Sequence, residues 1–170
     1  MIFEHFRDIY EHSLHLNPEK DSDFYDCAGD LLATDEVKSL AQFVQHDTIN
    51  RLRHIKSVSY MAYALTKHYG LDYRTTARAG VMHDLFYYDW HEKHGGHRLH
   101  GYRHPGFAVK NARELCGGLD EKTENLIRRH MWPLTPTPPK YKEGFILCVA
   151  DKYCAGMELL ICQKNKKAGK

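Results

Sequence analysis

The chain has 170 residues, a hydrophobic fraction of 42% and a formal net charge of +2 at pH 7. This length suits one globular domain with a sizeable core, and the small net charge excludes any strong electrostatic drive toward nucleic acid or membrane. No apolar run reaches the roughly 20 residues of a transmembrane helix. The N-terminus, with Glu4 and Asp8 inside it, does not match a signal peptide. We therefore expect a cytoplasmic protein with no membrane partner.

Histidine is the unusual residue type, with 13 copies in the chain. Because imidazole is the commonest metal ligand, this enrichment favours a metal site. The alternative for His91, His94 and His97 is that they are surface residues of a loop. The five cysteines form no CxxC pair and are odd in number, which is typical of reduced thiols in a cytosolic protein.

The first 46 residues are predicted to form helices that pack on the rest of the chain. Helical spacing of Phe3, Phe6, Ile9 and Tyr10 predicts a helix over 2–15, ended by Asn17–Pro18. A short helix over 23–32 follows. Thr34 is the expected N-cap of a third helix, whose predicted buried residues are Val37, Leu40, Ala41 and Val44.

Two longer helices are predicted next. One runs over 49–69, is capped by Asp47 or Thr48, and stops at Gly70. His54 falls on its apolar stripe, one turn before Val58, where a histidine is more often a packed core residue than a ligand. The other helix is capped by Asp72 and leads to His83–Asp84, and its Ala79–Gly80 pair allows close approach of a neighbouring helix. The apolar stripe of the first helix continues through Met61, Ala62 and Leu65.

The segment 87–103, which includes His100, has no clear period and is expected to be a loop that covers a substrate. His104 then precedes Pro105, a favoured first residue of a helix, and this helix is predicted over 106–115, ending at Cys116-Gly-Gly. Asp120 is the expected cap of a helix over 121–131, which carries His130.

The last helix is predicted over 143–162 and contains Asp151 within an apolar segment. A buried carboxylate there must be paired, protonated or bound to a cation. We find no strand alternation of note. We therefore expect an all-α, single-domain helical bundle with N-terminal helices over 1–46, a metal-binding domain over 47–162, and a basic, disordered tail over 163–170.

Six residues form a candidate metal site, and each comes from a different predicted helix except the adjacent pair His83–Asp84. Adjacent side chains on a helix diverge by roughly 100°, so His83 and Asp84 can share an ion only if it lies between them. Nitrogen and oxygen ligands of this kind suit Mn, Fe, Co, Ni or Zn rather than Ca. Two of the imidazoles could hold a second ion, with Asp84 bridging. The six are His54, His83, Asp84, His104, His130 and Asp151.

The order His54, His83-Asp84, Asp151 on a helical chain resembles the HD-domain superfamily of metal-dependent phosphohydrolases. The resemblance covers roughly residues 47–160. The runs Val81-Met-His83-Asp84-Leu and Val149-Ala-Asp151-Lys152 are similar to the family's two motifs. His104-Pro-Gly and Ile127-Arg-Arg-His130 are similar to the two extra histidines of its binuclear branch. The resemblance implies an HD-type bundle that binds one or two divalent transition-metal ions.

Differences between this chain and two branches of the family narrow the range of expected activities. The cyclic-di-GMP phosphodiesterase branch usually continues its dyad with Ile-Gly-Lys, where this chain has Leu85-Phe86-Tyr87. It also carries His-His-Glu and Gly-Tyr-Pro segments, where this chain has His130-Met-Trp-Pro and a proline run. The second-messenger synthetase/hydrolase group has an acidic pair downstream of the dyad that has no match here. We therefore do not expect these specific activities.

The resemblance implies that a metal-bound hydroxide attacks phosphorus, with Asp84 orienting it or taking its proton. Basic residues next to ligands would offset the phosphate charge, although each could belong to a solvated helix face. The expected substrate is a small phosphorylated molecule, with a nucleotide as one option because Trp90 and nearby tyrosines could stack on a base. We expect no specific nucleic-acid partner and allow an oligomer. The basic candidates are Arg53, Lys56, Arg103, Arg129 and Lys152.

Two other interpretations stay open. The same ligand set fits the mixed-valent di-iron oxygenases of the HD superfamily, which use O2 to cleave a C–C or C–P bond. A non-catalytic module that binds a nucleotide or a metal is the third interpretation. It is disfavoured because every candidate ligand is present in the chain.

Overall fold

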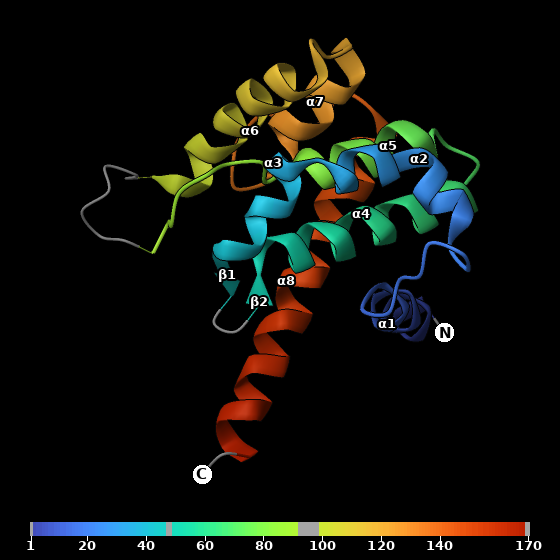
Figure 1. The fold of residues 1–170 in the computed structure, drawn as a ribbon, viewed down its shortest axis with the longest axis vertical. Helices are drawn as coiled ribbons and strands as arrows, with labels where there is room; N and C mark the ends of the chain where they lie inside the picture. The colour runs from blue at the N-terminus through green and yellow to red at the C-terminus, as the bar shows by residue number, and fades with distance from the viewer. Residues whose placement is uncertain (1, 47–48, 92–98, 169–170) are drawn as a thin grey trace.

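The computed structural model describes residues 2–46, 49–91 and 99–168. These residues fold into packed helices with one small sheet, so the expected all-α fold is confirmed (Figure 1). The elements in chain order are α1 (Ile2–Ser13), α2 (Ser22–Ala33), α3 (Asp35–Lys38), the 3₁₀ turn η1 (Ser39–Gln42), β1 (Val44–His46), β2 (Ile49–Asn50), α4 (Arg51–His68), α5 (Tyr73–Met82), α6 (His100–Cys116), α7 (Glu121–Arg129) and α8 (Lys142–Ala168).

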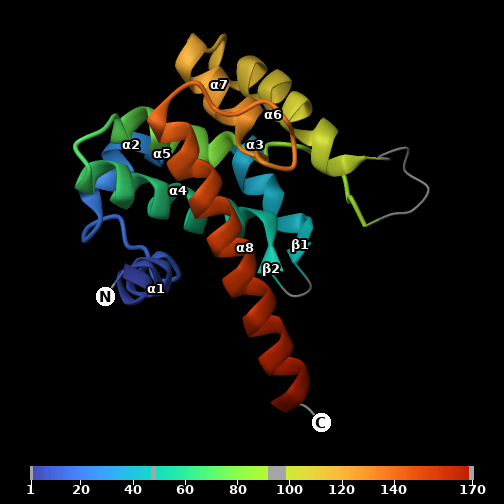
Figure 2. The ribbon, with the colours of Figure 1, turned by 180° about the vertical axis from the view of Figure 1, so that it is seen from behind.

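Helices α4, α5 and α8 form the centre of the bundle. A Cβ atom on Gly80 would lie 2.6 Å from Ser59 Cα, so the small residues of α5 do allow the close approach of α4. The long helix α8 crosses both helices and extends beyond the body at its C-terminal end (Figure 2). Val58, Met61 and Ala62 on the apolar stripe of α4 are fully buried between these elements.

The N-terminal helices pack against this centre. Helix α1 contacts α4, and α2 contacts α5. Ile9 and Tyr10 of α1 are buried, and the Phe6 ring lies edge-on to Tyr153 of α8 with centroids 5.5 Å apart. Apolar burial therefore joins the first 46 residues to the rest of the chain.

The predicted helix caps are confirmed at three positions. The side chains of Thr34, Asp72 and Asp120 each accept a hydrogen bond from the backbone N–H three residues later. Gly70 and Gly117 follow the ends of α4 and α6 with φ of +65° and +68°. This left-handed conformation costs glycine little, which explains why both helices end where they do.

Several sequence predictions differ from the structure. The third helix is only one turn of α-helix followed by a 3₁₀ turn, so Ala41 and Val44, predicted to be buried, are exposed. Residues 44–46 and 49–50 form an antiparallel hairpin that has too few residues to show alternation. Helix α4 therefore begins at Arg51 with Asn50 as its cap; Asp47 and Thr48 lie outside the described residues.

The boundaries of the C-terminal helices also differ. Helix α6 begins at His100 rather than after Pro105, so His104 lies inside the helix. Pro105 lacks the N–H that would bond to the Gly101 carbonyl, but this single loss does not end the helix. Helix α7 ends at Arg129, and α8 continues to Ala168, past the predicted end at Cys162. Residues 163–168 of the expected disordered tail are thus helical.

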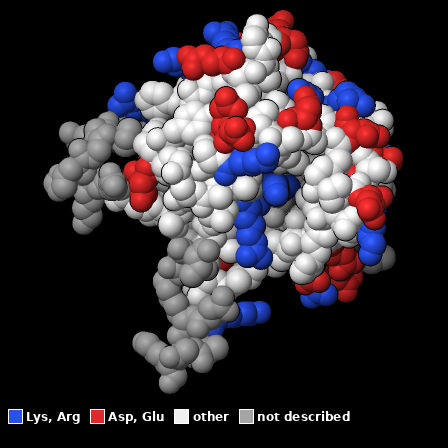
Figure 3. Space-filling model, viewed as in Figure 1, with Lys and Arg blue, Asp and Glu red and all other residues white. Residues whose placement is uncertain are grey.

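The surface carries charges of both signs. Figure 3 shows basic side chains near the centre of one face and acidic side chains along its upper and right edges. Among the described residues, no helix combines the length and apolarity that would let it cross a bilayer.

Candidate metal centre

The six candidate ligands meet in one buried cluster. His54 Nε2 lies 3.2 Å from Asp151 Oδ1, and His83 Nε2 lies 3.6 Å from the same oxygen. His104 Nε2 lies 3.2 Å from Asp84 Oδ1 and 2.9 Å from His130 Nε2. All six side chains are buried. The structure therefore brings together residues that lie up to 97 positions apart in the chain.

Helix ends supply several of these side chains. His54 projects from the first turn of α4, and Asp151 from the middle of α8. Helix α5 ends at Met82, with His83 as its C-cap. Because Asp84 lies beyond the regular helix, the 100° divergence of adjacent helical side chains does not apply to it. His130 is likewise the C-cap of α7.

The two oxygens of Asp84 face different histidine pairs. Oδ1 lies 3.2 Å from His104 Nε2 and 3.7 Å from His130 Nε2. Oδ2 lies 4.0 Å from His54 Nε2 and 3.8 Å from His83 Nε2. The cluster thus has two halves. We call His54, His83, Asp151 and Asp84 Oδ2 position one, and His104, His130 and Asp84 Oδ1 position two.

The hydrogen bonds of the histidines assign their tautomers. His83 Nδ1 donates to the Gly80 carbonyl at 2.8 Å, His104 Nδ1 to the His100 carbonyl at 3.0 Å, and His130 Nδ1 to the Ile127 carbonyl at 2.7 Å. His54 Nδ1 faces both carboxylate oxygens of Glu158, at 3.0 and 3.1 Å. With the proton on Nδ1, each neutral ring directs an Nε2 lone pair into the cluster.

This donor set fits a metal ion. His83 Nε2 and Asp84 Oδ1 are buried and have no hydrogen-bond partner, which is costly unless a cation is bound. Neutral rings would also place the lone pairs of His104 and His130 only 2.9 Å apart. Ligands about 2.1 Å from one ion and at right angles lie about 3 Å apart, so this separation suits octahedral coordination. Two subsets, His54–His83–Asp151 and His83–Asp84–His130, are compact enough to hold an ion.

The pKa shifts in the cluster also favour a bound cation. Burial alone raises the pKa of Asp84, but His83 and His104 outweigh it and hold that pKa well below its usual value. Burial lowers the pKa of His54, but Glu158 and Asp151 reverse the effect and raise it well above 6.5. Burial and the nearby charge of His83 lower the pKa of His130 to about 3. The carboxylates thus stay ionised and attract positive charge, which a proton on His54 or a metal ion can supply.

A cavity of about 230 Å³ opens onto the cluster. Its wall includes five of the six candidate ligands, the exception being His83, together with Trp90, His100 and Lys152. The Trp90 ring stacks on His100 with centroids 5.3 Å apart and also lies against His91 at 3.9 Å. Trp90, suggested above to stack on a base, therefore already contacts two imidazole rings of the protein.

The basic candidates are in different places. Lys152 lines the cavity, donates to the His130 carbonyl at 3.0 Å and lies 3.8 Å from Asp151 Oδ2. Arg53 and Lys56 line a separate cavity of about 270 Å³. Arg103 is exposed, with its guanidinium 5.7 Å from the centroid of the Phe107 ring. Arg129 is partly buried and does not line the cluster cavity.

The loop histidines also differ in placement. His91 is exposed and bonds locally to Asp89, as expected of a surface residue. His100 belongs to α6 and lines the cavity, and His94 and His97 lie outside the described residues.

Three residues that the sequence analysis did not select support the cluster: Gln45, Arg51 and Glu158. Gln45 Nε2 donates to Asp84 Oδ2 at 2.7 Å, and Gln45 Oε1 accepts from Arg51 Nε at 2.9 Å. Because guanidinium only donates and carboxylate only accepts, the amide of Gln45 can point only one way. Only Glu158 had a usable sequence signal, since it follows Asp151 by two helical turns on an apolar helix.

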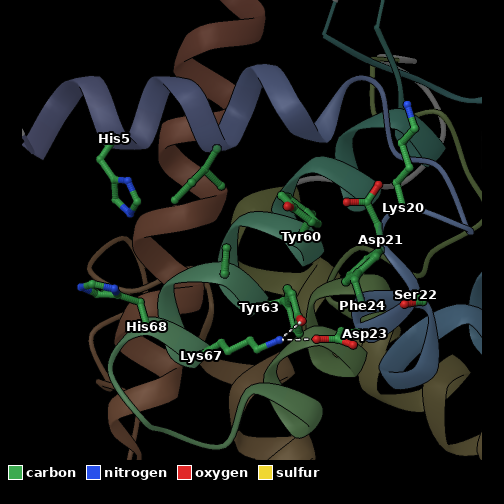
Figure 4. Close-up of a pocket in the computed structure, with 12 residues that line it drawn as sticks. His5, Lys20, Asp21, Ser22, Asp23, Phe24, Tyr60, Tyr63, Lys67 and His68 are labelled. Atoms are coloured by element: carbon green, nitrogen blue, oxygen red, sulfur yellow. Dashed lines mark hydrogen bonds and ion pairs between the residues drawn. The ribbon is translucent and has the colours of Figure 1, made fainter.

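A larger cavity of about 550 Å³ lies elsewhere, between α1, α2 and α4 (Figure 4). Lys67 donates to Asp23 Oδ2 at 2.7 Å and to the Tyr63 hydroxyl at 2.9 Å. Asp21 accepts from the backbone N–H of Asn17 at 2.8 Å, and its other oxygen lies 2.7 Å from His12 Nε2. These polar groups are therefore satisfied by bonds within the protein.

The fold and site together define an all-α protein with a buried group of imidazoles and carboxylates that can hold metal. Part of the chain is similar to Ribonuclease Y from Aquifex aeolicus (strain VF5), with 33% identity over 106 residues. This match covers 62% of the chain but only 17% of the relative. No protein-family model matches the chain, and no solved structure matches it significantly.

Proposed function

We propose that this chain is a metal-dependent phosphohydrolase of the HD type, acting on a small phosphate ester. The observation that carries the proposal is the convergence of four histidine Nε2 atoms and two carboxylates in one buried cluster beside a cavity. The partial similarity to Ribonuclease Y supports phosphate-ester chemistry. The five free cysteines support a cytoplasmic location.

The two positions defined above would hold one or two ions of Mn, Fe, Co, Ni or Zn, because imidazole and carboxylate ligands suit these metals. Bound there, divalent ions would lower the pKa of a coordinated water toward about 7 and polarise the phosphoryl group. Asp84 is proposed to serve both positions, because its two oxygens face different histidine pairs.

The chain's own residues would orient the reactants. Asp84 Oδ1 has no hydrogen-bond partner within the protein, so it can accept a proton or a hydrogen bond from the attacking water. Lys152 is the predicted cation that lines the cavity, so it would bind a phosphate oxygen. The placement of Lys56, Arg103 and Arg129 gives no support to that role.

The cavity favours a small substrate. Its volume of about 230 Å³ is below the range of roughly 300–1,000 Å³ that is usual for drug-sized ligands. It can take a phosphoryl group and part of a leaving group. Only one phosphate group of an RNA strand would fit in this volume. We therefore propose that the substrate is a small phosphorylated molecule rather than a nucleic acid.

The test begins with the metal content of the purified protein, followed by a screen of aryl phosphate monoesters, diesters and a short RNA with Mn²⁺, Zn²⁺ or Fe²⁺. We expect about two ions per chain and phosphate release from a small ester. Lys152→Met should raise KM about 10-fold or more, because it removes a charge-assisted bond to phosphate. Lys56→Met, the same change outside the cavity, is the matched control.

O2 consumption with Fe²⁺ and no phosphate release would instead identify an oxygenase. Metal binding without turnover under any of these conditions would identify a binding module. Either result would overturn the proposed hydrolysis.

A further inference from the structure

One of the four histidines in the cluster has a different outer partner from the others. His83, His104 and His130 donate Nδ1–H to main-chain carbonyls, which are neutral. His54 Nδ1 instead faces both oxygens of the Glu158 side chain, at 3.0 and 3.1 Å. Both side chains are 1% exposed. A buried carboxylate thus acts on a single imidazole of the cluster.

Helix α8 supplies this carboxylate and a candidate ligand from the same face. Asp151 and Glu158 are seven residues apart, which is close to two full turns of helix. Asp151 Oδ1 lies 3.2 Å from His54 Nε2, while Glu158 contacts Nδ1 on the other side of the ring. The imidazole is therefore held from both ends by one rigid element.

We expect the two positions to differ in metal affinity for two reasons, the carboxylate partner of His54 and the ligands of each position. A carboxylate partner at Nδ1 raises the electron density at Nε2, and loss of such a partner typically weakens metal binding 10- to 100-fold. Position one also has Asp151, whereas position two has two imidazoles and one shared carboxylate oxygen. Residues of both positions line the cavity, so the difference between the positions lies in their ligands and in Glu158.

We propose that Glu158 is a positioning residue that makes position one the tighter of two ion positions, so that the ions bind in a fixed order. The more weakly bound ion at position two is then the exchangeable one. This inference rests on the proposed function only in that it requires two ions. It does not depend on which ester is cleaved.

The test is calorimetric titration of metal-free protein with Mn²⁺, comparing wild type, Glu158→Gln and Glu143→Gln. Glu143 is a matched control because it is a buried carboxylate on the same helix that pairs with Lys122 instead. We expect two binding events in wild type. Glu158→Gln should weaken the tighter one about 10- to 100-fold and leave the weaker one within about twofold. Glu143→Gln should change neither.

Equal weakening of both events, or wild-type affinities in Glu158→Gln, would overturn the inference. If Glu158→Gln does not fold, the test is NMR of the imidazole N–H groups in the Zn²⁺-loaded wild type. The Nδ1 proton of His54 should then resonate further downfield than those of the other three histidines, and four similar shifts would overturn the inference.

Failure of the proposed function would give different results in these experiments from failure of this inference. If wild type binds no Mn²⁺, both ideas fall. If Glu158→Gln selectively loses the tight event and no phosphate ester is cleaved, the inference is supported and the proposed hydrolysis is not.

Discussion

Two cavities of this protein differ in how their polar groups are satisfied. The cavity between α1, α2 and α4, at about 550 Å³, exceeds the cluster cavity of about 230 Å³. Lys67, Asp23 and Asp21 in the larger wall are already bonded within the protein. The smaller cavity opens onto the cluster, where His83 Nε2 and Asp84 Oδ1 are both buried without a hydrogen-bond partner. Unsatisfied buried acceptors, rather than volume, therefore indicate the functional site.

The largest expected effect comes from removing one charge at the cluster. Asp84→Asn should reduce bound metal from about two ions to one or none and lower turnover at least about 100-fold, because one of its oxygens becomes an amide NH2 and the other loses its charge. Elemental analysis and ester hydrolysis measure this. Asp21→Asn, the same change in the larger cavity, should alter neither, and equal effects of both variants would remove the distinction between the two cavities.

A large loss of stability is expected from Arg51→Met. Arg51 is fully buried, donates to Gln45, to the Phe86 carbonyl at 2.7 Å and to the Tyr88 carbonyl at 3.2 Å, and stacks on the Phe86 ring at 3.6 Å. Methionine would leave these acceptors unsatisfied and destabilise the fold by about 3 kcal/mol. Urea unfolding of the metal-free protein gives the value. Lys67→Met in the larger cavity should cost much less, because Lys67 is half exposed.

Metal binding should stabilise the protein through the cluster alone. At a free metal concentration about 100-fold above Kd, the expected gain is about 2.7 kcal/mol in the free energy of unfolding. Melting curves with Mn²⁺ and with chelator measure the difference. Asp21→Asn should keep the full gain and Asp84→Asn should lose most of it; an equal gain in Asp84→Asn would place the metal elsewhere.

The smallest expected effect is the pH dependence of the stability that Asp21, in the larger cavity, contributes. Burial raises the pKa of Asp21, but the Asn17 N–H and His12 outweigh burial and lower it below 3.8. A depressed pKa contributes stability above the unfolded-state value, and this contribution is lost as pH falls through the folded-state pKa. Asp21→Asn should therefore cost about 1 kcal/mol at pH 6. This difference should shrink below about pH 4, and urea unfolding at several pH values tests it.

Local patterns in the sequence were enough to predict most helices and the six candidate ligands. Thr34, Asp72 and Asp120 cap helices because each bonds to a backbone N–H three residues later, a contact within one turn. The stripe through Val58 and Met61 is likewise a property of one helix. Asp151 stood out because a carboxylate in an apolar segment requires a partner.

Only the tertiary structure decided how these candidates are supported. Gln45 meets Asp84 across 39 residues, and His54 meets Glu158 across 104. Such contacts depend on helix crossings and on a short hairpin, and neither produces a periodic pattern in the sequence. The start of α6 at His100 was likewise missed, because Pro105 predicted a start after it. Sequence periodicity reports which face of an element is buried, whereas the partner of a buried polar group depends on the packing of distant elements.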